Sequence, residues 1–375
     1  MAEALKNIYH STFLSQLAAR LHSAWPGFDE QRFLRLVFVD SWEESPLKTR
    51  MRIITRALGD CLPERYPDAL EVLYKIDRDC TGLPFLIFPD FVEQFGRAPE
   101  HWELSMTALA RFTRGSSSEF AVRPFLLSAP ERMMRQMTIW AQDADEHVRR
   151  LASEGCRPRL PWGQALPMFK QQPAPILPIL EQLKQDESLY VRKSVANNLN
   201  DIAKDNPQVV RDIAHRWLGT HPHTDWIVRH GCRTLIRRDD PQILALFGYS
   251  SEQEGLVEQA KLELSAPQAA IGERIELSYE LRVRAGGPVK IRIEYAIGFV
   301  KANGRSSEKR FLLSDRTVAG GTRLSGSRRH NWADLTTRKH YPGSHRIRLL
   351  VGGIGVAEAV LELHAQGGVS GEQGR

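Results

Sequence analysis

The first 250 residues of the chain carry apolar side chains with the period of an α-helix. In residues 46–62, 101–113 and 130–143, apolar residues recur at three- and four-residue spacing, which gives a helix one apolar face. Five prolines stand at positions where a helix could begin, which is consistent with the tolerance of the first helical turn for proline. These prolines are Pro99, Pro130, Pro178, Pro207 and Pro241. The pattern predicts that residues 1–250 are helical almost throughout.

After Tyr249 the pattern changes to short stretches in which apolar and polar residues alternate. Gly, Pro, Asn and Ser separate these stretches, which cover 261–267, 274–283, 289–300, 308–314, 345–353 and 357–365. Such alternation is typical of antiparallel strands with one buried face. About seven strands in roughly 110 residues predict a small all-β immunoglobulin-like sandwich over residues 258–365. We expect a linker over 251–257 and, because it is rich in Gly and Gln, a disordered tail over 366–375.

A Val-Arg pair recurs in the helical region and indicates internal repeats. Successive pairs are 43 and then 37 residues apart; they are Val148-Arg149, Val191-Arg192 and Val228-Arg229. This period is typical of paired-helix repeats of the HEAT type, which stack into a curved solenoid. The predicted fold class is therefore multidomain, with an all-α HEAT-like helical-repeat solenoid over 1–250 followed by the β-sandwich.

Stacked repeats would place residues at the same offset from each Val in rows. Two residues after each Val the row is Arg150, Lys193 and His230, and six residues after it the row is Glu154, Asn197 and Thr234. Cations bind phosphate, and an anion can stabilise a cationic transition state. A row of bases beside a row that contains a carboxylate therefore suits a phosphate backbone with a reactive centre next to it.

Charge, hydropathy and cysteine content narrow the function classes. The net charge is +6, and residues 258–375 hold 19 Lys and Arg against 12 Asp and Glu, whereas residues 1–257 hold 32 against 33. This asymmetry favours an anionic partner, although a solvated surface would produce the same excess. No apolar run reaches the ~20 residues of a membrane span, and the N-terminus lacks the apolar core of a secretory signal, so a cytoplasmic protein is expected. The four cysteines form no CxxC pair, which favours reduced thiols over a disulfide framework or a zinc site.

Three segments of the helical region resemble the AlkC branch of the AlkC/AlkD DNA glycosylases. They are SSSEFAVRPFL at 116–126, HVRRLASEGCRPRLPWG at 147–163 and YVRKSVANNLNDIAKDNP at 190–207. That family consists of HEAT-like bacterial enzymes that excise alkylated bases, and many AlkC-type members carry a C-terminal immunoglobulin-like domain. The resemblance covers nearly the whole chain. It implies hydrolysis of the N-glycosidic bond of cationic lesions such as 3-methyladenine and 3-methylcytosine for base excision repair, without the usual extrusion of the base into a pocket.

The three segments contain the candidate catalytic carboxylates Glu119, Glu154 and Asp201. A cationic alkylated base is already a good leaving group, so the enzyme chiefly has to stabilise an oxocarbenium-like sugar and position a water. Carboxylates can do both. The resemblance favours a catalytic role for Glu119. Glu154 is favoured by its place in the row of residues six positions after each repeated Val.

Each carboxylate also has a structural alternative. Glu119 could lie in the first turn of a serine-capped helix, and Glu154 could form an ordinary exposed ion pair with Arg150. Asp201 could belong to a solvated helix face. The pair Asn197-Asn198 weakens that last alternative, because asparagine is a poor helix former and usually stays for a hydrogen bond, here to Asp201, a backbone group or DNA.

Trp162 is the fourth candidate catalytic residue. It lies between Pro161 and Gly163, so we expect it on a loop or at a helix start. A buried core tryptophan is the usual alternative, and Trp217 is expected to be one. The family resemblance favours Trp162 as a wall against the deoxyribose or the damaged nucleotide, where the face of its ring would attract a cation.

DNA contacts are expected from basic and polar residues in both domains. In the helical domain the candidates are Arg149, Arg150, Arg157, Arg159, Lys193 and Asn197, whereas Arg192 and Arg229 are expected to bridge repeats. In the β-domain the basic segments 325–332 and 336–343 are interpreted as loops that could reach the backbone or minor groove, or simply be soluble ends. Their candidate residues are Arg328, Arg329, Arg338 and Lys339.

The sequence favours an enzyme without a cofactor or a metal. It contains no GxxxxGK[ST], HExxH or GxSxG motif. Schiff-base chemistry is not expected either, since no lysine in the three segments lies among apolar residues, and Lys193 is the only candidate. The expected partner is double-stranded DNA containing alkylated bases. The protein is expected to bind it as a monomer and to have no membrane partner. Two competing hypotheses are a non-catalytic HEAT scaffold and a protein that binds lesions without excising them.

Overall fold

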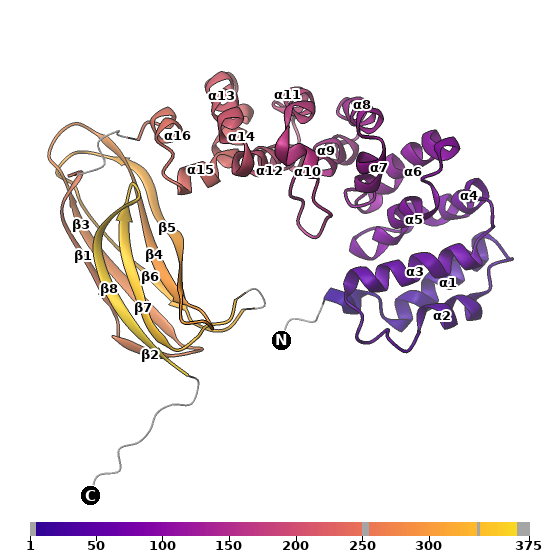
Figure 1. The fold of residues 1–375 in the computed structure, drawn as a ribbon, viewed down its shortest axis with the longest axis horizontal. Coiled ribbons are helices and arrows are strands. Elements are labelled where there is room, and N and C mark those ends of the chain that lie inside the picture. The colour runs from indigo at the N-terminus through magenta and orange to yellow at the C-terminus, as the bar shows by residue number, and fades with distance from the viewer. Residues whose placement is uncertain (1–4, 250–254, 336–337, 366–375) are drawn as a thin grey trace, which may run out of the picture. The chain divides into compact units, whose positions relative to one another are not determined.

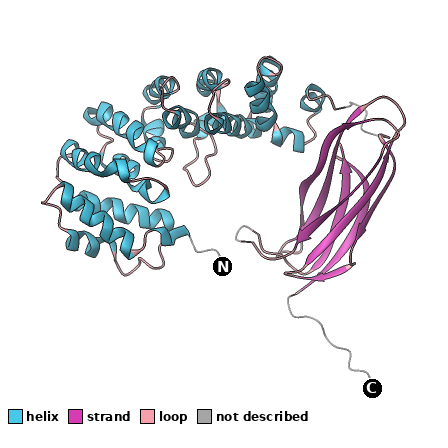
Figure 2. Cartoon of the chain, turned by 180° about the vertical axis from the view of Figure 1, so that it is seen from behind, coloured by secondary structure: helices cyan, strands magenta, loops and turns pink. Residues whose placement is uncertain are grey.

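The computed structural model describes residues 5–249, 255–335 and 338–365 and divides into two compact units, Met1–Arg233 and Thr234–Arg375. The first unit is helical and the second contains all the strands of the described residues (Figures 1 and 2). A helical region followed by a β-domain was predicted, and this order is confirmed. Most of the predicted linker 251–257 and the whole predicted tail 366–375 lie outside the described residues.

Short helices follow one another along the first unit. The α-helices are α1 (Ser11–Ala24), α2 (Glu30–Val37), α3 (Leu47–Cys61), α4 (Tyr66–Ile76), α5 (Ile87–Phe95), α6 (Trp102–Gly115), α7 (Val122–Ser128), α8 (Pro130–Trp140), α9 (Glu146–Gly155), α10 (Pro167–Gln171), α11 (Leu177–Leu183), α12 (Leu189–Asp205), α13 (Pro207–Trp217) and α14 (Pro222–Gly231). Short 3-10 helices lie between them: η1 (Leu5–Ile8), η2 (Asp77–Asp79), η3 (Leu83–Leu86), η4 (Pro99–His101) and η5 (Ala174–Ile176).

The Val-Arg signature marks helices that pack against one another in a row. Helix α9 contacts α6 and α12, and α12 in turn contacts α14. The valines that open the repeats on α9, α12 and α14 are all buried; they are Val148, Val191 and Val228. The arginines Arg149 and Arg192 bond the carbonyls of the residues five and six positions earlier, at 2.7–3.0 Å. The sequence repeat therefore corresponds to a repeated packing unit.

The helices of this row also begin in the same way. Side chains of Asp145, Ser188 and His221 accept a hydrogen bond from the backbone N–H two residues later, at 2.8–3.2 Å. Such caps satisfy backbone donors that the first turn leaves without a partner. Of the five prolines predicted to start helices, Pro130, Pro207 and Pro241 are the first residues of α8, α13 and α16 (Pro241–Leu246). Pro99 begins the 3-10 helix η4, and Pro178 is the second residue of α11.

The second unit is a β-sandwich of two sheets. Its strands are β1 (Val257–Leu264), β2 (Gln268–Ala270), β3 (Arg274–Val283), β4 (Val289–Val300), β5 (Ser306–Val318), β6 (Arg323–Asn331), β7 (Gly343–Val351) and β8 (Ile354–His364). One sheet has the order β1-β3-β6 and the other the order β2-β8-β7-β4-β5. All pairings are antiparallel except β2 with β8. Alternate residues of the strands, such as Leu277, Ile293 and Leu349, form the apolar core between the sheets.

The last two helices, α15 (Arg233–Arg237) and α16, are tied to the sheet of the second unit. Lys290 on β4 donates to the Phe247 carbonyl at 2.9 Å. The Tyr249 hydroxyl donates to the carboxylate of Asp315 on β5 at 2.7 Å, and Arg310 pairs with Asp239 at 2.6 Å. The sequence pattern groups these helices with the repeats, whereas their polar contacts join them to β4 and β5.

Strand β6 corrects one prediction. Residues 325–332 were interpreted as a basic loop, but Arg323–Asn331 pair with β3 along their whole length. Only Leu324 and His330 of β6 are buried, because β6 is an edge strand whose other residues face solvent. An edge strand of this kind lacks the alternation of apolar residues on which the prediction relied.

The helices and the cysteines can be compared with the expectations of no membrane span and no disulfide framework. Within the described residues, no helix combines the length and the apolar character that crossing a bilayer requires. The four cysteines are buried, and none of them forms a disulfide in the described part of the chain.

Three histidines lie in the core of the β-sandwich. His330, His340 and His345 are each at most 8% exposed, and each ring lies within 5.5 Å of the Trp332 ring. Burial lowers the pKa of all three, that of His330 to about 4, and the nearby charge of Arg338 lowers the pKa of His330 and His340 further. The folded β-domain therefore favours neutral imidazoles.

This cluster predicts that the protein loses stability on acidification. Unfolded histidines titrate near pH 6.5, so below that value the unfolded state binds more protons than the folded state, until the folded pKa is reached. The shift of His330 alone predicts a loss of about 2 kcal/mol in the free energy of unfolding between about pH 7.5 and about pH 5. Urea unfolding of the full chain at both pH values measures this loss. In His330→Phe the loss should be smaller by that amount, and an equal loss in both proteins would place the acid sensitivity elsewhere.

Candidate active site

The three candidate carboxylates come from different segments of the helical unit and meet in one cluster. Glu119 lies in the turn before α7, Glu154 in the last turn of α9 and Asp201 in α12. Their side chains are 14%, 6% and 2% exposed. Cationic side chains alternate with them in a continuous series, here named the charge chain: Glu119, Arg150, Glu154, Arg157, Asp201 and Lys204.

Hydrogen-bonded ion pairs link successive members of the charge chain. Arg150 bonds Glu119 and lies 3.5 Å from Glu154. Arg157 bonds Glu154 Oε1 at 2.6 Å through Nη1 and Asp201 Oδ2 at 2.9 Å through Nε and Nη2. Lys204 closes the series at 2.9 Å from Asp201 Oδ1.

Two serine hydroxyls complete the coordination of the carboxylates. Ser194 on α12 donates to Glu154 Oε2 at 2.7 Å, and Ser117 donates to Glu119 Oε2 at 2.9 Å. A buried charge is costly unless it is paired and its remaining lone pairs are bonded. The charge chain meets this condition with three carboxylates and three cations.

The structural alternatives considered for the carboxylates are wrong. Helix α7 begins at Val122 without a side-chain cap, so Glu119 is not in a capped first turn. Glu154 is buried and bonded on both oxygens, so it is not an exposed ion-pair member. Asp201 is 1% exposed and does not belong to a solvated face. The burial of Glu154 and Asp201 was not visible locally, because it arises from contacts between α9 and α12.

Two arginines expected at DNA phosphates are instead committed to buried carboxylates. Arg157 is 7% exposed and lies between Glu154 and Asp201. Arg149 bonds Asp186, whose side chain is 5% exposed, at 2.7 Å, and thereby connects α9 to the turn before α12. These ion pairs argue against a phosphate contact for either side chain. The sequence shows that both residues are basic, but it does not show whether their side chains face DNA or a carboxylate of the same protein.

Other predicted contact residues are more accessible. Lys193 is exposed and forms no ion pair within residues 5–249, 255–335 and 338–365. Arg159 is 39% exposed and pairs with Asp205 at 2.6 Å. Asn197 accepts a hydrogen bond from Arg233 at 2.9 Å. Its neighbour Asn198 is fully buried and donates to the Ser153 carbonyl at 2.8 Å, so it joins α12 to α9 through a backbone group, one of its three predicted roles.

Trp162 lies on a tight turn formed by residues 158–166, here named the Trp162 turn. This turn is part of the loop between α9 and α10, which projects on the side opposite α8, α11 and α13 (Figure 1). Trp162 is 63% exposed, so the loop prediction is confirmed and the core alternative is wrong. Trp217 is 2% exposed and is a core residue as predicted.

The backbone at Trp162 is strained, because its φ of 61° falls in the left-handed region that bulky residues avoid. Such a conformation costs about 1–3 kcal/mol and persists only when its surroundings hold it. The Leu166 N–H bonds the Pro158 carbonyl at 3.2 Å. Buried Arg123 bonds the carbonyls of Gln164 and Gly155, and Lys48 donates to the Trp162 carbonyl at 2.5 Å.

Neither Arg123 nor Lys48 was predicted to take part in the site. Arg123 belongs to a fourth Val-Arg pair, and this repetition is the one signal that could have pointed to it. Lys48 lies on α3, far outside the three segments that carry the family resemblance. No local pattern distinguishes it from the other basic residues of that helix.

The Trp162 turn and two of the carboxylates border one cavity of about 280 Å³. Its lining residues are Leu83, Leu86, Ser117, Glu119, Phe120, Glu154, Arg157, Leu160, Pro161 and Trp162. Asp201 is not among them and stands behind Arg157. The cavity thus combines an exposed indole, carboxylate oxygens and an apolar wall.

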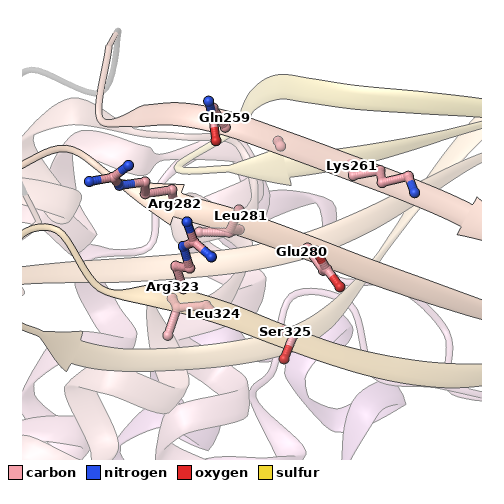
Figure 3. A pocket seen from close by; sticks show the side chains of 9 residues that line it. Gln259, Lys261, Glu280, Leu281, Arg282, Arg323, Leu324 and Ser325 are labelled. Atoms are coloured by element: carbon pink, nitrogen blue, oxygen red, sulfur yellow. The ribbon is translucent and has the colours of Figure 1, made fainter.

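A larger hollow of about 490 Å³ lies on the outer face of the three-stranded sheet (Figure 3). The charged side chains that border it are three cations, Lys261, Arg282 and Arg323, and one carboxylate, Glu280. It contains none of the predicted site residues. Mixed charges on a solvated sheet face are ordinary, so the smaller cavity remains the candidate site.

The basic candidates of the β-domain lie on β6 and the segment after it. Arg328 and Arg329 are exposed on β6, and Lys339 is exposed as well. Arg338 is partly buried, with its guanidinium 4.3 Å from the centre of the Phe299 ring. Thr336 and Thr337 lie outside the described residues.

Comparison with known proteins shows which class of protein this chain belongs to. Residues 115–235 match the sequence family described as DNA alkylation repair enzyme, and residues 258–365 match the C-terminal Ig-like domain of the uncharacterised protein YhaZ. The chain thus combines a DNA alkylation repair domain with an immunoglobulin-like domain.

Two full-length relatives define the family more narrowly. The chain is 48% identical to the uncharacterized protein YhaZ of Bacillus subtilis (strain 168), over 93% of this chain and 96% of that protein. It superimposes with a TM-score of 0.92 and 39% identity on the alkylpurine DNA glycosylase AlkC of Pseudomonas fluorescens, a structure bound to DNA containing an abasic site analog. That match covers 97% of this chain and 100% of the other. The chain therefore belongs to the AlkC-type branch of the DNA alkylation repair family, as the sequence motifs predicted.

The charge chain predicts a large difference between two neighbouring arginines. Arg157→Met leaves Glu154 and Asp201 buried without their shared partner, and the free energy of unfolding should fall by about 3–5 kcal/mol. Arg159→Met removes an exposed pair with Asp205 and should cost less than about 1 kcal/mol. Urea unfolding of the two variants measures both values. Similar small losses would mean that the charge chain is not a structural requirement.

Proposed function

We propose that this protein is a DNA glycosylase that hydrolyses the N-glycosidic bond of cationic alkylated bases in duplex DNA. The observation that carries the proposal is the cavity where Glu119 and Glu154 lie beside the exposed Trp162. Family membership supports it, and so does the match over nearly the whole chain to the alkylpurine DNA glycosylase AlkC of Pseudomonas fluorescens.

In the proposed reaction a water attacks C1′ of the deoxyribose as the bond from C1′ to the base nitrogen breaks. The bonding electrons neutralise the cationic base, which leaves without needing a proton. Positive charge develops on the sugar, and the carboxylates of Glu119 and Glu154 stabilise it. One of them accepts the proton of the attacking water. The face of Trp162 packs against the sugar or the cationic nucleotide.

The three carboxylates have different positions and therefore different proposed roles. Glu119 is the most exposed and borders the cavity, so it is best placed to meet the sugar. Glu154 borders the cavity but is held by Arg157 and Ser194. Asp201 reaches the cavity only through Arg157. We propose that Asp201 acts as a positioning residue that fixes Arg157, and through it Glu154.

We further propose 3-methyladenine and 3-methylcytosine as substrates, excised without extrusion of the base. A ligand pocket usually encloses roughly 300–1,000 Å³, and the cavity of about 280 Å³ is small for a flipped nucleotide together with a water. An exposed indole and nearly buried carboxylates suit an approach to the sugar along the duplex. All three carboxylates come from one chain, so a monomer suffices.

The accessible cations are the proposed phosphate contacts. In the helical unit these are Lys193 and Arg159, and in the β-domain they are Arg328, Arg329 and Lys339, with partly buried Arg338 beside them. Arg150 is not among them, because its side chain is 14% exposed and is paired with Glu119 and Glu154. Arg149 and Arg157 are left out because both are bound to buried carboxylates. Asn197 is retained as a proposed polar contact to DNA, since the hydrogen bond from Arg233 uses its amide oxygen and not its amide nitrogen.

The proposal predicts that the cavity carboxylates are required for base release. Glu119→Gln and Glu154→Gln should each lower the single-turnover rate on duplex DNA containing 3-methyladenine by about 10²–10³-fold, the size expected for loss of one electrostatic stabiliser. Released base is quantified by chromatography, with folding checked by circular dichroism. The matched control is Glu146→Gln, at the exposed start of the same helix α9, which should leave the rate unchanged.

Two other results would redirect the proposal. If the wild-type protein binds damaged duplex DNA but releases no base from either lesion, it is a lesion-binding protein. If it binds no DNA, a non-catalytic helical-repeat scaffold is the better hypothesis.

The phosphate contacts predict a change in the salt dependence of binding. Lys193→Gln should weaken binding to all duplex sequences alike and reduce the slope of log K against log salt by about one. Fluorescence polarisation over a salt series measures the slope. Lys184→Gln is a suitable control, because Lys184 pairs with Glu181 and lies 5.6 Å from the Trp217 ring. Equal slopes in wild type and Lys193→Gln would remove Lys193 from the interface.

A further inference from the structure

Lys48 reaches the candidate site from a helix that none of the motifs includes. It lies at the start of α3, and its Nζ donates to the Trp162 carbonyl at 2.5 Å. The same Nζ lies 4.0 Å from the centre of the ring of Phe120, which borders the cavity. Residues 115–235 alone match the repair-enzyme family, so Lys48 is a contribution from outside the matched segment.

The contact is made at the strained residue itself. Arg123 bonds the Gln164 carbonyl, and the Leu166 N–H bonds the Pro158 carbonyl, so both hold the ends of the Trp162 turn. Lys48 instead holds the carbonyl of Trp162, where φ is 61°. A charged donor on that oxygen fixes the plane of the peptide after Trp162. Because the adjoining backbone angles set the direction of the side chain, the bond also limits where the indole can point.

Charged groups on α3 and α5 lie near Lys48, where the carboxylates of Asp90 and Glu93 attract its ammonium and Arg52 repels it. Arg52, one turn further along α3, pairs with Asp90 at 2.8 Å and with Glu93 at 2.7 Å. Asp90 is 3% exposed, and burial raises its pKa to about 6. Burial lowers the pKa of Lys48, while the nearby carboxylates of Glu93 and Asp90 act in the opposite direction. This surrounding makes Lys48 part of an ordered group.

We propose that Lys48 is a positioning residue that holds Trp162 in its strained conformation, so that the indole faces the cavity bordered by Glu119 and Glu154. Loss of the bond should free the indole and slow base release while leaving DNA affinity nearly unchanged. The kinetic part of this proposal rests on the proposed glycosylase function. The conformational part does not, because the mobility of Trp162 can be measured in the protein alone.

The first test measures the mobility of Trp162 by time-resolved fluorescence anisotropy. The Trp162 signal is the difference between a protein and its Trp162→Phe derivative, taken in the wild-type, Lys48→Met and Lys48→Arg backgrounds. We expect a larger amplitude of nanosecond motion in Lys48→Met and partial restoration in Lys48→Arg, which keeps a charged donor. Lys75→Met is the matched control, because Lys75 also donates to a backbone carbonyl, that of Ala24, at 3.1 Å. Unchanged anisotropy in Lys48→Met would overturn the proposal.

The second test separates chemistry from binding. Single-turnover release of 3-methyladenine should fall by about tenfold or more in Lys48→Met, since small misplacement of a catalytic group is costly. The Kd for the same duplex should change by less than about threefold, and Lys48→Arg should recover part of the rate. A reduced affinity with an unchanged rate would make Lys48 a phosphate ligand and refute the positioning role. If wild type releases no base, the proposed function fails while the anisotropy test still decides the role of Lys48.

Discussion

The candidate site depends on the requirement that charges removed from water be paired. Glu154 and Asp201 are almost wholly buried, and they are tolerated because Arg157 lies between them and Arg150 and Lys204 flank them. An uncompensated charge in this position would cost several kcal/mol. Carboxylates are unfavourable inside an apolar core, and the same arrangement places those of Glu119 and Glu154 at the wall of a cavity. Structure and proposed chemistry thus use the same groups.

The helical repeats supply the framework that makes such pairing possible. Buried valines fix the spacing between successive helices, and Asn198 ties α12 directly to the backbone of α9. Gly155 allows close packing at the end of α9, because a Cβ there would lie 2.7 Å from a Val122 methyl group. Repeats that are otherwise independent are therefore locked together where the carboxylates meet.

The sequence predicted those parts of the fold that depend on local chemistry. Proline positions marked helix starts, and the alternating stretches 274–283 and 289–300 coincide with β3 and β4. The motifs also named the carboxylates and Trp162. The failures share one cause, since the role of Arg157, the course of edge strand β6 and the contribution of Lys48 are all decided by partners distant in the chain. Composition and period cannot show which of several arginines in one segment faces a buried carboxylate.

The charge chain also has a consequence for how the molecule assembles. Two of its ion pairs, Arg150 with Glu119 and Arg157 with Asp201, join residues 31 and 44 positions apart, and the Ser194–Glu154 hydrogen bond spans 40 positions. None of these three contacts can form within a single helix. Helical arrays can nucleate in one repeat and extend to the next, but these ion pairs come together only after α7, α9 and α12 have docked. The site should consequently be absent from partly folded arrays and appear with the last cooperative step. Fraying of one repeat would abolish it before much helix is lost.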